Sequence, residues 1–151
     1  MLDATNTTPS DFMTSDHRSC DALWAEVEGH ADADDAAGAQ IAFTRFRDAM
    51  IQHFTREEEQ LFPALEPVMG MPPGVGPVAV MRMEHAQMRG VLAQMESAAM
   101  GGDWAEMVDQ GDTLLMLIQQ HNVKEEAILY PMADRALGSE WQRMAQGWTV
   151  G

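Results

Sequence analysis

The apolar residues of this chain recur every three or four positions over four long stretches, which is the period of an amphipathic helix. The helices expected from this pattern run from about Asp16 to Ala31, from about Ala39 to Leu65, from near Pro77 to Gly101, and from Asp103 through Leu129. Proline, glycine and acidic residues fill the connections, and short connections between long helices favour antiparallel neighbours. The pattern therefore predicts an all-α, up-down four-helix bundle.

The two ends of the chain fall outside the four stretches. We expect an N-terminal segment, the bundle, and a short C-terminal helix with a tail, at residues 1–14, 15–135 and 136–151. Phe12 and Met13 are apolar enough to dock on the bundle. Trp141 and Trp148 are the expected packing groups of the last helix.

Composition and charge narrow the classes of partner. The 151 residues include 9 basic and 24 acidic ones, a formal net charge of −15, which argues against nucleic acid or an anionic membrane as a partner. No apolar run approaches the roughly 20 residues of a membrane-spanning helix. The N-terminus lacks the basic and apolar regions of a secretory signal, and Cys20 is the single cysteine, so the sequence predicts a cytoplasmic protein.

One motif occurs twice in the sequence. The stretch 53-HFTREEEQLFP-63 returns as 121-HNVKEEAILYP-131, a shift of 121 − 53 = 68 positions. His17 and His85 are separated by the same 68 positions, and each follows an acidic residue. The chain therefore has two similar helical hairpins, Asp16–Pro63 and Glu84–Pro131, which predicts an approximate two-fold axis through the bundle.

The repeated motif places a histidine and a carboxylate on one helix face. His53 and Glu57 are four residues apart, about one turn, and so are His121 and Glu125. That face is the apolar one, and an unpartnered buried carboxylate costs several kcal/mol, which a cation offsets. With the remaining two histidines, four imidazoles and two carboxylates suit a pair of first-row metal ions bridged by the carboxylates. The predicted ligands are His17, His53, Glu57, His85, His121 and Glu125.

Neighbouring residues are assigned to packing or to the surroundings of the site. Cys20 is interpreted as a small buried hydrophobe, and the 14 methionines as core filling. Tyr130 lies nine residues after His121, so we expect it on the opposite face, in packing. Two roles stay open for the acidic neighbours, solvation or hydrogen bonding around the ligands; these residues are Asp16, Glu58, Glu84 and Glu126.

Together these motifs resemble the hemerythrin-like, or HHE cation-binding, family. The resemblance covers about residues 16–131 and rests on Asp16-His17, His53-x3-Glu57-Glu58, Glu84-His85 and His121-x3-Glu125-Glu126. It implies a four-helix bundle around an oxo- or hydroxo-bridged pair of iron ions, with zinc or manganese as other candidates. It also implies that the four histidines are terminal ligands and the two glutamates bridge.

The pattern departs from the oxygen-carrying hemerythrins, which have a fifth histidine on the third helix and a bridging Asp on the last. Met81 and Arg89 stand around His85 instead, and Glu125 follows His121 after four residues. The ligand set is more similar to the di-iron domain of repair-of-iron-centres proteins. Loss of the fifth histidine is expected to leave an open position for a ligand.

Three functions follow as hypotheses. The first is a metal-binding protein that takes a small ligand, namely dioxygen, nitric oxide or peroxide, in sensing, stress response or iron handling. The second is a di-iron enzyme for iron-centre repair, nitric oxide reduction or peroxide turnover. The third is a non-reactive bundle whose metals only hold the helices together.

Overall fold

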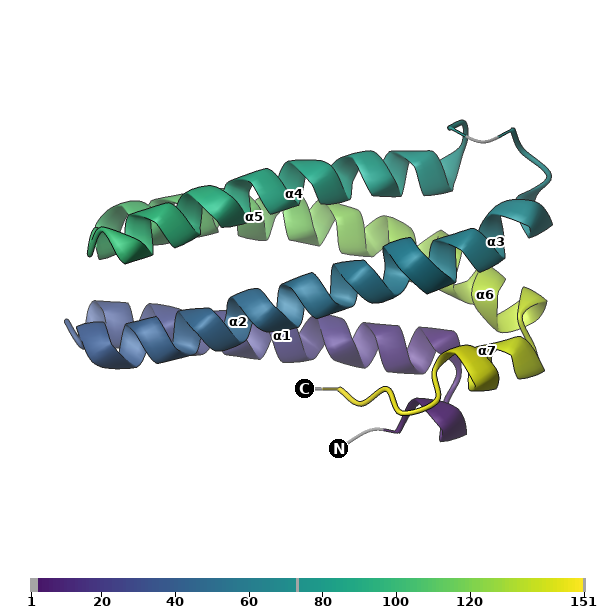
Figure 1. Cartoon of the computed structure of the whole chain (residues 1–151), viewed down its shortest axis with the longest axis horizontal. Coiled ribbons are helices and arrows are strands. Elements are labelled where there is room, and N and C mark those ends of the chain that lie inside the picture. Colours follow the sequence, from purple (N-terminus) through teal and green to yellow (C-terminus); the bar gives the residue numbers. More distant parts are fainter. Residues whose placement is uncertain (1–2, 73, 151) are drawn as a thin grey trace.

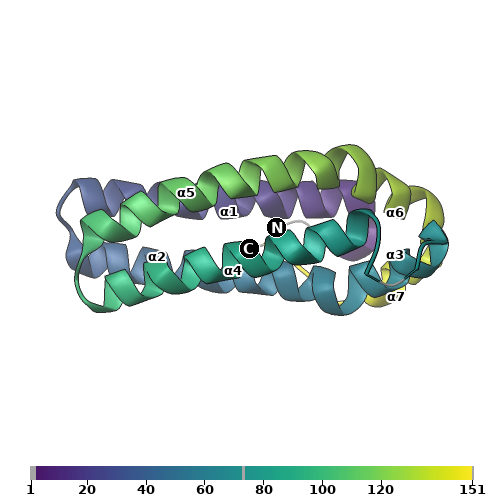
Figure 2. The same ribbon diagram turned by 90° about the horizontal axis from the view of Figure 1, so that it is seen from above.

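A computed structural model describes residues 3–72 and 74–150 of the chain. Four long helices form an up-down bundle, and they are α1 (Pro9–Asp32), α2 (Ala36–Arg56), α4 (Pro77–Met100) and α5 (Trp104–Lys124). The hairpin of α1 and α2 forms one layer and the hairpin of α4 and α5 the other (Figure 1, and from above in Figure 2). The prediction of an all-α four-helix bundle is confirmed, since 84% of the described residues are helical.

Side-chain caps explain where the helices begin. Asp35 and Asp103 accept hydrogen bonds from the backbone N–H groups of Gly38 and Glu106, at the starts of α2 and α5. The predicted start of the first helix near Asp16 is wrong. Thr8 caps α1 and Pro9 occupies its first position, so the helix begins seven residues earlier. Its added turns bury Phe12 and Met13 completely. The division into segments 1–14, 15–135 and 136–151 stays a prediction.

The sequence pattern predicted that the second and fourth helices are uninterrupted α-helices, and this prediction is wrong. Each passes into a π-helical turn, η2 (Glu57–Leu61) and η3 (Glu125–Leu129), before continuing as α3 (Phe62–Met69) and α6 (Tyr130–Ala136). The N–H groups of Phe62 and Tyr130 donate to the carbonyl oxygens of Glu57 and Glu125, five residues back. A π turn holds one more residue than an α turn, and such turns occur frequently at functional sites.

Two apolar clusters fill the bundle. One lies toward the α1–α2 and α4–α5 connections and includes Trp24, Phe43 and Phe46. The other lies at the opposite end, where α3, α6 and the short α7 (Ser139–Met144) meet the N-terminal turn η1 (Ala4–Asn6). Ionisable side chains lie between the clusters, so the apolar packing shields them from water on both sides.

The C-terminal residues close the second cluster as expected from the sequence. The rings of Trp141 and Trp148 lie 6.0 and 6.2 Å from the ring of Phe12, centroid to centroid. The indole N–H of Trp141 donates to the carbonyl oxygens of Ala4 and Thr7 at 3.1 and 2.9 Å. The last helix therefore ties the two ends of the described chain together.

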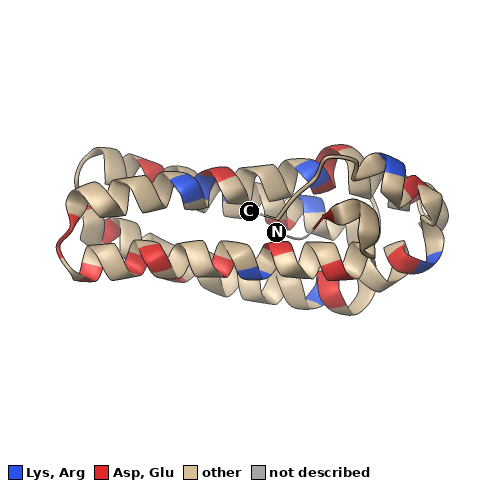
Figure 3. Cartoon of the chain, turned by 90° about the horizontal axis from the view of Figure 1, so that it is seen from below, with Lys and Arg blue, Asp and Glu red and all other residues tan. Residues whose placement is uncertain are grey.

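In the part of the chain that the structure describes, no helix combines the length and the apolar character that crossing a lipid bilayer requires. Acidic positions are spread over the layer of α1 and α2 and over the turns, as the view from that side shows (Figure 3).

Candidate metal centre

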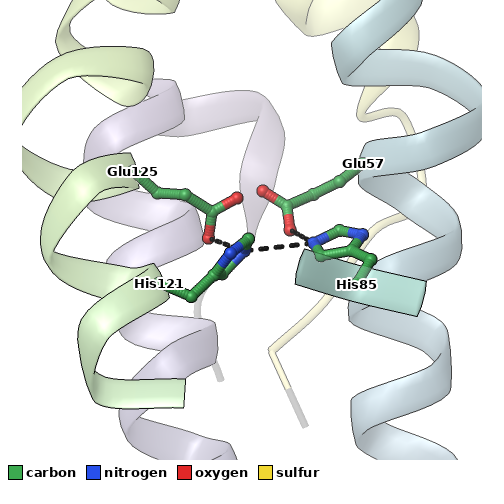
Figure 4. A group of neighbouring side chains, drawn as sticks. All are labelled: Glu57, His85, His121 and Glu125. Carbon is green, nitrogen blue, oxygen red and sulfur yellow. Dashed lines mark hydrogen bonds and ion pairs between the residues drawn. The ribbon is translucent and has the colours of Figure 1, made fainter. Parts of the chain in front are cut away.

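All six side chains predicted to bind metal converge between the two apolar clusters. They come from four helices and two π turns, and none exposes more than 6% of its surface: His17, His53, Glu57, His85, His121 and Glu125. Four of them, Glu57, His85, His121 and Glu125, offer donor atoms within 4.8 Å of one another, and His17, His53 and Glu125 form a second such group. Figure 4 shows the two carboxylates approaching each other from opposite helices, beside the imidazoles of His85 and His121.

The donor atoms form two pairs of nitrogens joined by two carboxylates. The Nε2 atoms of His17 and His53 lie 3.1 Å apart, and those of His85 and His121 also lie 3.1 Å apart. Glu57 Oε1 is 3.0 Å from Nε2 of His53 and 3.2 Å from Nε2 of His85. Glu125 Oε1 is 3.1 Å from Nε2 of His121 and 3.2 Å from Nε2 of His17. Each carboxylate therefore touches one histidine of each hairpin, which is the arrangement that bridging requires.

The other nitrogen of every histidine pairs with an outer carboxylate. The Nδ1 atoms of His53 and His121 lie 2.7 and 2.9 Å from Asp16 and Glu84 of their own hairpins.

The remaining two pairs cross between the hairpins. His17 Nδ1 lies 2.8 Å from Glu126, and His85 Nδ1 lies 2.8 Å from Glu58. A carboxylate at Nδ1 holds the proton there, which directs the Nε2 lone pair inward and raises the basicity of the ring. The open question about the four acidic neighbours is thus decided in favour of hydrogen bonding.

The electrostatics of the site favour cations. Burial alone would lower the pKa of His53, but Glu57 and Asp16 outweigh it and raise that pKa well above its usual value. Burial would also lower the pKa of His17 and of His121. The contact with Glu125 is the main cause that raises both pKa values above their usual range. The positive charge that forms at His53 overcomes burial and lowers the pKa of Glu57 well below its usual value. Because metals compete with protons for such groups, the same field favours a divalent ion.

Two geometric observations show that the residues fit a metal pair. Glu57 Oε1 and Glu125 Oε2 are fully buried and have no hydrogen-bond partner of acceptable geometry among the described residues. Two nitrogens that bind one ion at right angles, at metal–nitrogen distances of about 2.1 Å, lie about 3.0 Å apart. Both histidine pairs match that separation.

Tyr130 is part of this cluster, so its predicted place on the opposite face is wrong. Its hydroxyl oxygen lies 2.9 Å from Glu57 Oε2, 3.0 Å from Glu125 Oε1 and 3.0 Å from His17 Nε2, so its single proton is shared between the two carboxylates. Burial, with the two carboxylates, raises the pKa of Tyr130 well above its usual value, so the hydroxyl keeps its proton.

The π turn explains the position of Tyr130. An uninterrupted α-helix would turn the fifth residue after Glu125 about 140° away from it, whereas the extra residue of the π turn reduces the offset to about 40°. Both π turns lie within the repeated motif, in which two glutamates are followed by an aromatic residue and a proline. The spacing of apolar residues in the sequence does not reveal the extra residue of the turn.

A small apolar cavity lies on the other side of the histidines. It has a volume of about 10 Å³, enough for one water-sized molecule, and its walls include Cys20, Met50, Phe54, Met88 and Ile118. Burial raises the pKa of Cys20 to about 12, so its thiol stays protonated. This agrees with the interpretation of Cys20 as a buried hydrophobe rather than a metal ligand.

Comparison with known protein families matches residues 8–133 to the hemerythrin HHE cation binding domain. Comparisons with curated proteins and with solved structures found no significant match. Because the family match covers most of the chain and includes every residue of the buried cluster, the protein belongs to the hemerythrin HHE cation-binding family.

Proposed function

We propose that the protein binds two iron ions at the buried cluster and, through them, a small uncharged ligand such as dioxygen or nitric oxide. The observation that carries the proposal is the convergence of four imidazole nitrogens on two carboxylates, each of which touches a histidine from both hairpins. His17 and His53 would hold one ion and His85 and His121 the other, with Glu57 and Glu125 between them. A pair of ferrous ions held there would supply a binding position and electrons for such a ligand.

The residues around the site support a small and uncharged ligand. Cys20, Met50, Phe54, Met88 and Ile118 surround the cavity beside the histidines, which has room for one water-sized molecule. A larger organic substrate does not fit in a space of this size. The outer carboxylates hold the four imidazoles in orientation, and the buried phenol of Tyr130 holds the bridging carboxylates.

The proposal is tested by metal analysis together with the ultraviolet–visible spectrum of the purified protein. We expect about two iron ions per chain and absorption of a bridged ferric pair in the near ultraviolet. Replacing Glu57 or Glu125 by Ala is expected to reduce the iron content below one per chain, because each carboxylate serves both ions. Glu59→Ala is the matched control, since Glu59 lies on the same π turn but is exposed. Two ions in the Glu57→Ala protein would contradict the assignment. A colourless zinc protein would favour a structural role.

Turnover of peroxide is a second candidate function, favoured by the Tyr130 hydroxyl. Peroxide chemistry needs a proton donor near the metal, and this hydroxyl lies within hydrogen-bond distance of both bridging carboxylates. Release of dioxygen from peroxide, with slower turnover in Tyr130→Phe, would establish the enzyme. Iron donation to damaged clusters is an alternative activity of the same site, measured by transfer of labelled iron. We place either function in the cytoplasm, because the single cysteine is a buried free thiol.

A further inference from the structure

The outer face of α4 is unusual for so acidic a protein, because it carries no charge. Seven residues at alternating spacings of four and three line this face, and we call them the α4 seam: Ala79, Met83, Ala86, Gly90, Ala93, Ser97 and Met100. Met83 and Met100 expose 65% and 80% of their surfaces. Only Ala79 is partly covered, and the other members are exposed. The spacing is that of a coiled-coil contact, in which a helix packs along another helix.

The equivalent face of α1 shows that the fold does not require this composition. Shifting the α4 seam by 68 positions gives Asp11, Ser15, Arg18, Ala22, Ala25, Gly29 and Asp32 on α1, three of them charged. The charged residues of α4 lie off the seam and pair within the chain. Arg89 binds Glu58 and Glu96 binds Arg47, for example, at 3.1 and 2.8 Å. The hairpins therefore share their inner chemistry and differ on this outer surface.

The α4 seam is complementary in size to a second copy of itself. A two-fold axis at Gly90 would place two α4 helices antiparallel and bring together residues whose numbers add to about 180. Met83 then faces Ser97 of the other copy, Met100 faces Ala79, and Ala86 faces Ala93. Each long side chain meets a short one, and the glycines at the axis permit close approach of the backbones.

Charge favours the same arrangement. Two copies with a net charge of −15 repel each other across most surfaces, but the α4 seam brings no acidic residue against another. Arg82 and Glu96 flank the α4 seam, and the axis at Gly90 places the Arg82 of one copy near the Glu96 of the other. Their side chains are 39% and 41% exposed, so each is free to extend its ion pair across the contact. Opposite charges at flanking positions select partner and orientation in coiled coils.

We propose that the protein forms a symmetric dimer through the α4 seam, with the two α4 helices antiparallel about Gly90. The α4 seam is about 32 Å long and contributes fewer residues than a standard-sized interface, so the dimer is expected to dissociate on dilution. The contact lies outside the buried cluster and does not depend on the identity of the metal.

Sedimentation of the metal-loaded full chain over a concentration series tests the dimer. We expect the mass to rise from the 16.7 kDa of one chain toward twice that value. Gly90→Glu and Ala93→Glu are expected to keep the protein monomeric at every concentration. Ala22→Glu and Ala25→Glu, at the equivalent exposed positions of α1, should leave the dimer unchanged. Helical content and metal content, measured for all four variants, show whether each is folded.

A cross-linking experiment tests the orientation. Under mild oxidation, Gly90→Cys is expected to join two chains, because the axis places these residues together. Ala22→Cys should not, and Cys20 is buried and remains unreactive. A parent protein that stays at 16.7 kDa up to its solubility limit overturns the proposal. So does a dimer that survives Gly90→Glu, or one that Ala22→Glu disrupts equally.

Discussion

The two hairpins bring the same ligand types to the buried cluster, but one pair of equivalent aromatic residues differs by an oxygen atom. Tyr130 packs its ring against His17 at 5.5 Å between centroids, and Phe62, 130 − 68 positions along the chain, packs against His85 at 5.4 Å. The rings occupy equivalent places, yet only Tyr130 brings a hydroxyl to the carboxylates. A repeated sequence can therefore build two similar ligand pairs and still make them chemically inequivalent through one substitution.

The apolar cores of the hairpins differ in a compensating way. Gly111 corresponds to Phe43, and Trp24 corresponds to Leu92. A Cβ atom on Gly111 would lie 2.1 Å from Cη2 of the Trp24 ring, so the ring occupies the space that a side chain would need. The ring of Trp24 in the first hairpin therefore fills the volume that the missing side chain of Gly111 leaves in the second. This shows that packing constrains the sum of the side chains rather than each hairpin separately.

The largest expected difference between the hairpins is the loss of metal affinity when the outer carboxylate that holds His53 or His121 is removed. The side chain of Asp16 is 7% exposed, whereas that of Glu84 is 22% exposed and also binds Lys124. Removing such a partner lowers metal affinity about 10- to 100-fold. We expect Asp16→Ala to reach the upper end of that range, because water cannot replace the buried carboxylate, and Glu84→Ala the lower end. Competition with a chelator measures both affinities, and equal losses would contradict the ranking.

Exchanging the aromatic residues tests whether the hydroxyl makes the halves inequivalent. Tyr130→Phe is expected to lower the free energy of unfolding of the metal-free protein by about 1–3 kcal/mol, since buried carboxylate oxygens lose a donor. Phe62→Tyr in the same chain should recover most of the loss, because the pseudo-two-fold axis brings the new hydroxyl to the same carboxylates. Urea titration of both single variants and the double variant measures this coupling. Simple additivity of the two changes would show that the halves are not interchangeable.

The smallest expected effect is a change in stability when a glycine of the apolar core is replaced by alanine. Gly111→Ala is expected to destabilise the protein by about 1–2 kcal/mol, because overpacking against Trp24 exceeds the gain in helix propensity. Gly29→Ala is the matched control on α1, where an added Cβ meets no atom within 4 Å, and it should stabilise by about 0.5–1 kcal/mol. Urea midpoints at constant slope compare the two variants. Stabilisation by Gly111→Ala would show that the Trp24 ring moves freely.

The sequence was sufficient for the architecture and for the residues that meet in the core. Four amphipathic stretches, the helix starts at Pro77 and after Asp103, and the shift of 68 positions are local or periodic signals, and the structure has four long helices with these two starts. The first helix begins seven residues before its predicted start, because Thr8 caps it and Pro9 takes its first position. This signal is as local as the cap at Asp103, so the sequence contains it.

Features that depend on three-dimensional contact lay beyond sequence reasoning. Glu58 and Glu126 bind histidines that only the opposite hairpin supplies. Tyr130 reaches the centre through a π turn whose extra residue leaves no mark in the spacing of apolar positions.

The sequence by itself determined that four helices place histidines and glutamates on inward faces, because helical periodicity assigns each residue to a side of its own helix. Tertiary structure decided which of these groups touch, which nitrogen each outer carboxylate holds, and where the one phenol lies. Those outcomes depend on the relative positions of helices and on the energy of burying charge, and neither is a property of a single segment.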